Sequence, residues 1–111
     1  MKYVLLICDD EKVSPSMEEI AADPAHHAYA AELDRRGASL GGARLRPVAD
    51  ATTVRVRDGE TLVSDGPYAE TKDFVGGIDI IECADLDDAI AIASRHPYAQ
   101  HGCIEVRPVW E

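Results

Sequence analysis

The sequence contains no apolar run long enough to cross a lipid bilayer, and its opening apolar stretch, residues 2–8, is too short for the core of a signal peptide. We therefore expect a cytoplasmic protein that does not enter a membrane. The sequence also contains no internal repeat, low-complexity tract or interdomain linker. With 111 residues, of which 46% are apolar, the chain can fill one modest core, so we expect residues 1–111 to form a single domain.

Cysteine is scarce, and the three cysteines lie far apart in strand-like apolar runs, at Cys8, Cys83 and Cys103. They lack the close pairs that zinc sites and redox motifs need, so we expect buried, reduced thiols. The histidines and acidic residues show no ligand spacing, and no serine or cysteine stands in a nucleophile motif. The sequence thus predicts no metal, no other cofactor and no covalent catalysis.

Positive charge is in deficit, with 11 basic against 21 acidic residues and a formal net charge of −10. The basic residues are scattered rather than clustered, so a nucleic-acid backbone would be repelled and we expect no nucleic-acid binding. The acidic surface has two interpretations, since it either serves solubility or meets a basic protein partner.

The first third of the chain predicts a strand followed by two helices. Residues 2–8 are apolar on both alternating faces, as in a central strand that is covered from both sides. A capping-box spacing begins at Ser16, and Asp23 followed by proline is typical of a second helix start. Gly37 supplies a helix end. The predicted helices cover residues 16–22 and 24–36.

The middle of the chain predicts an irregular strand and a hairpin. Residues 38–48 are weakened as a strand by Gly41 and Gly42, and Pro47 indicates a sheet edge or a strand end. The dipeptide Asp58-Gly59 accepts the positive φ angles of a tight hairpin turn. The predicted hairpin strands are residues 53–57 and 61–64.

The last third predicts a strand, a helix and a final strand. Residues 76–83 form the strand, and acidic residues from Asp85 onward start a helix that residues 95–97 end. Residues 103–109 alternate apolar and polar side chains. The apolar stripe predicted for the helix comprises Leu86, Ala89, Ile90 and Ala93.

The resulting order, β, α, β, hairpin, β, α, β, is an α+β plan of the ferredoxin-like, split βαβ type with an inserted β-hairpin. Both principal helices would pack on one face of the sheet. The other face would carry half of the apolar side chains of residues 2–8, and in a monomer it would be exposed to solvent. We therefore expect a homodimer in which two sheets face each other.

The most specific feature is a polar turn directly after the hairpin. Gly66-Pro67 forces the turn. Four ionisable side chains lie on either side of it, and core packing requires none of them. The nine residues are Asp65-Gly66-Pro67-Tyr68-Ala69-Glu70-Thr71-Lys72-Asp73. They closely resemble the signature of the DGPF-type proteins of the YCII-related family, in which the last residue is usually glutamate. Flanking segments also match in order, so the resemblance covers nearly the whole chain and implies a dimeric α/β barrel.

His26 and Asp65 are the candidate catalytic pair. His26 shares a helical stripe with Tyr29 and Leu33 and should face the sheet. The resemblance implies that a histidine in this Pro-Ala-His context works with an aspartate, and we pair His26 with Asp65, which ends a strand at a turn. A histidine oriented by a carboxylate suits proton transfer. The alternatives are an ordinary half-buried histidine and an aspartate that only builds the turn.

The remaining candidates are substrate-binding residues. Tyr68 either supplies a phenol group to the site or only forms part of the pocket wall. Glu70 and Lys72 share a face of an extended segment and form an ion pair or contact the substrate. Arg107 shares the polar face of the last strand with Glu105, where it either holds an anion or forms a salt bridge.

The leading hypothesis is a small dimeric protein that binds a small polar or anionic molecule beside the loop of residues 65–73. General acid-base chemistry by His26 and Asp65 would then drive elimination, isomerisation or hydrolysis. The alternative is a non-catalytic interaction module. The resemblance implies a partner for it, since some DGPF-type proteins are encoded with or fused to extracytoplasmic-function sigma factors.

Overall fold

The computed structural model describes residues 1–12, 14–67 and 73–111, and it confirms the predicted order of elements. Four strands form the main sheet: β1 (Lys2–Asp9), β2 (Ser39–Arg44), β5 (Phe74–Glu82) and β6 (Cys103–Pro108). The hairpin consists of β3 (Thr52–Arg57) and β4 (Glu60–Asp65). The α-helices are α1 (Met17–Ala22), α2 (Pro24–Arg36) and α3 (Leu86–Ser94). Two short 3₁₀ helices, η1 (Val48–Asp50) and η2 (Pro97–Gln100), were not predicted.

The boundaries follow local signals that the sequence displays. Ser16 and Glu19 form a reciprocal capping box at the start of α1, and the Asp23 side chain accepts the Ala25 N–H at the start of α2. Gly37 ends α2 with a φ of 63°, a left-handed conformation that glycine adopts without a steric penalty.

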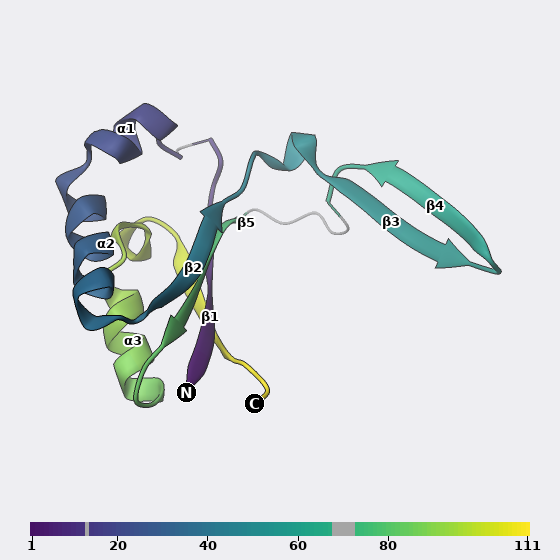
Figure 1. The fold of residues 1–111 in the computed structure, drawn as a ribbon. Helices are drawn as coiled ribbons and strands as arrows, with labels where there is room; N and C mark the ends of the chain where they lie inside the picture. The colour runs from purple at the N-terminus through teal and green to yellow at the C-terminus, as the bar shows by residue number, and fades with distance from the viewer. Residues whose placement is uncertain (13, 68–72) are drawn as a thin grey trace.

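The main sheet has the order β2-β5-β1-β6, and every neighbouring pair is antiparallel. This α+β arrangement is compatible with the predicted ferredoxin-like plan, with β2 at an edge as expected. The hairpin forms a separate two-stranded sheet. It projects from the main sheet on the side opposite to the helices (Figure 1). Within the described residues, neither sheet closes into a barrel.

The helices cover only one face of the main sheet (Figure 1). Odd-numbered side chains of β1 are buried against them, whereas on the open face Val4, Leu6 and Cys8 are half-buried and Lys2 is exposed. Core residues therefore come from the helices and from one face of the strands: Tyr3, Leu5, Leu33, Ala38, Ile81, Cys83, Ala89, Ile92 and Ala93. None of the helices described is both long and apolar enough to pass through a membrane.

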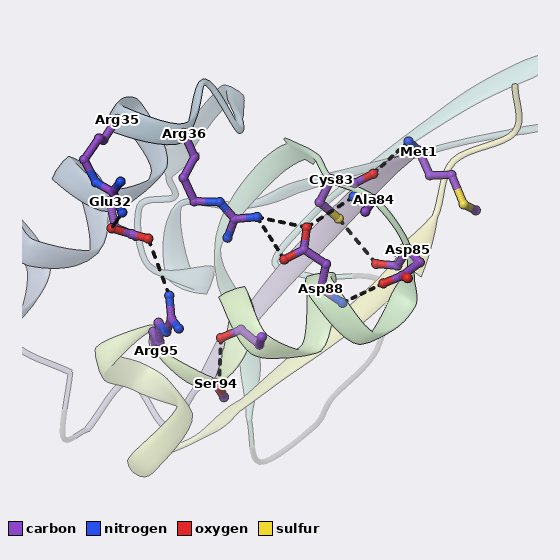
Figure 2. A network of polar contacts seen from close by, with 11 residues as sticks. Met1, Glu32, Arg35, Arg36, Cys83, Ala84, Asp85, Asp88, Ser94 and Arg95 are labelled. Atoms are coloured by element: carbon purple, nitrogen blue, oxygen red, sulfur yellow. Dashed lines mark hydrogen bonds and ion pairs between the residues drawn. The ribbon is translucent and has the colours of Figure 1, made fainter.

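Ion pairs hold α2 and α3 side by side on this face (Figure 2). One guanidinium nitrogen of Arg36 lies 2.9 Å from each carboxylate oxygen of Asp88. This hydrogen bond lowers the pKa of Asp88 from its usual value. Glu32 on α2 pairs with Arg95, which directly follows α3. The pairs thus link α3 to α2, the helix that carries His26.

The predicted apolar stripe of α3 needs a correction. Leu86 and Ile90 are about half exposed, at 50% and 51%, whereas Ile92 is buried at 2% exposure together with Ala89 and Ala93. The stripe that faces the sheet is thus rotated relative to the predicted one, because Ile92 rather than Ile90 packs beside Leu33 in the core.

The prediction of buried thiols is also wrong in part. Cys83 is buried, but Cys8 is half-buried and Cys103 is exposed. Cys8 and Cys103 are far apart in the sequence, yet they face each other across β1 and β6. Burial, together with the neighbouring Cys103, raises the pKa of Cys8 to about 11, so its thiolate is scarce at neutral pH.

Candidate functional site

His26 lies in the first turn of α2, where the cap of that helix also orients its ring. Asp23 accepts the Ala25 N–H with Oδ1 and contacts His26 Nδ1 with Oδ2, at 2.7 Å. The bond from His26 lowers the pKa of Asp23, so the partner of the ring is a carboxylate at neutral pH. An ionised carboxylate can only accept, so Nδ1 is the donor, and in the neutral form of the ring the lone pair is on Nε2.

The predicted partner of His26, Asp65, lies elsewhere. It is exposed at the end of β4, in the two-stranded sheet, and pairs in register with Thr52. It lines neither of the two cavities that His26 lines. Within the described chain, the carboxylate that meets His26 is Asp23.

Of the other predicted site residues, the structure describes only Arg107. Tyr68, Glu70 and Lys72 lie outside the described residues. Arg107 is exposed on β6, where its Nε lies 3.6 Å from Glu105, in the salt bridge that was the alternative to anion binding. It does not line the cavities beside His26.

A cavity of about 680 Å³ opens beside His26, at the end of β1 and between α1, α2 and η2. Its volume is within the range of small-molecule sites. The described lining is mostly polar and combines acids with histidines: Asp9, Pro15, Glu19, Ile20, Asp23, His26, Pro97, Tyr98, Gln100 and His101.

Asp9 and Tyr98 are buried residues of this lining, and each has an oxygen atom without a hydrogen-bond partner among the described residues. Asp9 is 4% exposed, and its Oδ2 accepts the Ser14 hydroxyl at 2.8 Å, but its Oδ1 has no partner among the described residues. Tyr98 is 8% exposed, and its hydroxyl also lacks a partner in this part of the chain. Leaving such an atom unpaired costs roughly 1–3 kcal/mol, so we expect water or a bound molecule to supply the missing partners.

A second polar layer lies beneath α2, between that helix and the sheet. His96 is buried with its ring edge-on to three other rings, at centroid distances of 4.7 Å to Tyr29, 5.5 Å to Tyr98 and 5.8 Å to His26. A smaller cavity of about 200 Å³ reaches this layer and includes His26, Asp79 and His96 in its lining. His26 thus connects the polar layer to the larger cavity.

Burial keeps His96 neutral. It lowers the pKa of His96 to about 4, with a smaller contribution from the nearby charge of His26. His96 Nδ1 accepts the Tyr98 N–H at 3.0 Å, so in the neutral ring the proton is on Nε2. The ring caps η2 and thereby places Tyr98 in the cavity wall.

Asp79 of β5 is the acidic member of the polar layer. Its Oδ2 accepts the Tyr29 hydroxyl at 3.0 Å, and burial raises the pKa of both side chains. A methyl group on Gly42 of β2 would lie 2.4 Å from Asp79 Oδ1, so this edge strand needs glycine for the carboxyl group to fit.

The sequence contained signals for the residues that our prediction missed. The alternation of β1 continues to Asp9, which has the same parity as Leu5 and Ile7 and therefore shares their buried face. Proline at residue 97 is typical of the first position of a helix, which makes His96 the candidate cap of η2, but this pattern does not indicate that the ring is buried.

Among the described residues, no three or more His, Cys, Asp or Glu side chains gather in a way that could hold a metal ion. The chemistry that this arrangement supports is proton transfer by His26, with Asp23 fixing the tautomer and with Asp9 and Tyr98 available for binding.

Two comparisons relate the chain to known proteins. A family model described as "YCII-related domain" matches residues 1–111. Among curated proteins, the chain is 36% identical to "Uncharacterized protein R00369" of Rhizobium meliloti (strain 1021), over 98% of this chain and 92% of that protein.

The neutral His96 predicts a loss of stability in acid. Its folded pKa of about 4 is below the ordinary value of 6.5, so between these pH values the unfolded chain binds a proton that the folded chain does not. The free energy of unfolding should therefore fall as the pH drops from 6.5 to 4, by roughly 2–3 kcal/mol from this residue.

Urea denaturation of the wild type and of His96→Asn at several pH values measures this contribution, because asparagine keeps an acceptor for the Tyr98 N–H but does not titrate. The variant should show a shallower pH dependence over that window. His101→Asn, at the exposed end of η2, is the matched control. Equal slopes for wild type and His96→Asn would show that His96 is not held neutral.

Proposed function

The chain belongs to the YCII-related family, and on that premise we propose that it is a small, cytoplasmic, homodimeric protein that binds a small polar molecule and transfers a proton to or from it with His26. Elimination, isomerisation and hydrolysis are the reaction classes that such a residue serves without a cofactor. The observation that carries the proposal is the contact of 2.7 Å between His26 Nδ1 and Asp23 at the wall of a cavity.

The role of His26 follows from its tautomer. With Nδ1–H held by Asp23, Nε2 is the free basic atom of a residue that lines the cavity, so it is the proton acceptor in the forward direction. The imidazolium that forms is stabilised by the negative charge of Asp23. Asp9 and Tyr98 would position the bound molecule, since each offers an unpaired buried oxygen.

This proposal predicts opposite tautomers for two neighbouring histidines. In ring ¹⁵N NMR spectra of the neutral form, His26 should be protonated at Nδ1, whereas His27, whose Nε2 bonds to the Ala21 carbonyl, should be protonated at Nε2. Asp23→Ser should remove the Nδ1 preference of His26 while preserving the helix, because serine is an equally good N-cap.

Asp65→Asn is the matched control and also tests the pairing predicted from the sequence. If Asp65 orients the ring, this substitution will change the His26 signals and Asp23→Ser will not. A wild-type His26 protonated mainly at Nε2 would contradict the proposal, and the interaction-module hypothesis would then be the better one.

The dimer is proposed on the open face of the main sheet. Val4 and Leu6 of β1 lie there opposite Ile80 and Ile78 of β5, and they are only half-buried because no helix of the described chain covers them. An apolar sheet face of this kind is stable when a second copy covers it. Two such sheets packed face to face would give the dimeric α/β barrel that the family resemblance implies.

Light scattering tests the dimer with a matched pair of substitutions. The wild type should show twice the 12.0 kDa chain mass at micromolar concentration. Ile80→Glu should give monomers, because it buries an unpaired charge in the proposed interface. Ile90→Glu makes the same change on the half-exposed surface of α3 and should leave the dimer intact. A monomeric wild type would rule the dimer out.

A second candidate function is protein interaction through the hairpin. Val54, Val56 and Val63 share one hairpin face and are 59–64% exposed. An exposed apolar patch is a frequent feature of protein contacts. The proposed partner for this surface is an extracytoplasmic-function sigma factor, and this function would not require His26.

A further inference from the structure

We propose that the cavity lined by Asp9, His26 and Tyr98 binds a small organic ammonium ion that also carries a hydroxyl or carbonyl oxygen. This rests on the proposed function and specifies the class of molecule on which His26 would act.

The charges of the described lining favour a cation over an anion as the ligand. The described lining contains three carboxylates, from Asp9, Glu19 and Asp23, and no lysine or arginine. Arg44 lies beside this lining: it lines the smaller cavity, its Nη2 donates to the Pro15 carbonyl at 2.6 Å, and its positive charge acts on Tyr98. With three carboxylates against this one guanidinium, the cavity attracts a cation more strongly than an anion.

All three carboxylates have at least one partner, and Asp9 accepts the Ser14 hydroxyl. Glu19 Oε1 accepts the Ser16 N–H in the capping box, and Asp23 bonds to Ala25 and His26. Asp9 differs, because it is more than nine-tenths buried and one of its oxygens is unpaired. A buried carboxylate oxygen needs a donor, and a charged donor is the strongest that a small molecule can offer.

The Tyr98 hydroxyl is a second, independent unpaired group, and unlike the Asp9 carboxylate it can donate a hydrogen bond to the ligand. This buried hydroxyl therefore requires an acceptor atom in the ligand. His26 Nε2, with its proton on the other nitrogen, offers a second acceptor for the ligand. The three groups thus match a molecule with a donor-rich cationic end and a nearby oxygen.

Three probes of the same size and different charge separate the ligand classes. Ethanolamine is a cation at neutral pH, ethylene glycol is neutral and glycolate is an anion, and all three carry a hydroxyl group. Titration at millimolar concentration, followed by ¹H–¹⁵N NMR, should shift the amide signals of Asp9, Ser14 and Tyr98 with ethanolamine. Glycolate should produce no saturable shift at these amides.

Asp9→Asn should weaken the binding of ethanolamine about tenfold or more, since a charge-assisted hydrogen bond is lost. Asp10→Asn is the matched control: it makes the same change in net charge at a neighbouring residue that does not line the cavity. Tyr98→Phe keeps the ring and removes only the hydroxyl, so it tests the same site with a variant that should fold, and it should weaken ethanolamine binding.

The proposal is overturned if glycolate binds at these amides as tightly as ethanolamine, if none of the probes binds there, or if Asp9→Asn and Asp10→Asn weaken binding equally. These failures are distinguishable from a failure of the proposed function. The same spectra report the His26 tautomer, and an Nδ1-protonated ring would leave the proton-transfer role standing with a different ligand.

Discussion

The two-residue repeat of β1 places both the core and the candidate site on the same face of the main sheet. Tyr3, Leu5 and Ile7 point toward the helices and bury their side chains there. Asp9 is the next residue of this series, so the pleat that builds the core also carries a carboxylate into the interior. A shift of register by one residue would expose the core and remove Asp9 from the cavity.

The polar layer beneath α2 depends on neutral groups. A charged histidine in the position of His96 would need a partner, but burial keeps this ring neutral and one of its nitrogens caps η2. The Asp79 carboxyl group is bonded to Tyr29, and Gly42 leaves room for it. These contacts join α2, β2 and β5 to η2, and they hold His26 between two cavities.

The fold was predictable to the extent that it depends on local signals. Capping residues, the glycine after α2, the Asp58-Gly59 turn and the alternation in β6 each specify an element without reference to distant parts of the chain. The stripe of α3 was predicted less well, because Ile90 and Ile92 are equally apolar and only the tertiary packing decides which is buried.

The site was less predictable for the same reason. His26 could be placed on the buried side of its helix from spacing alone, and it is half-buried there. The partner of His26 could not be predicted from the sequence. Asp23 has an obvious role as a helix cap, and nothing in the sequence shows that its second oxygen contacts the ring. The burial of His96 and the position of Cys8 opposite Cys103 on neighbouring strands depend on elements that meet only in the folded chain.

The most direct test of the central claim is a high-resolution crystal structure of the protein at neutral pH, inspected at the end of β1. We expect an open cavity, lined by His26, in which a bound molecule or an ordered water contacts Asp9 Oδ1 and the Tyr98 hydroxyl. A collapsed cavity, in which Asp9 and Tyr98 satisfy each other or Asp9 turns out to solvent, would contradict it.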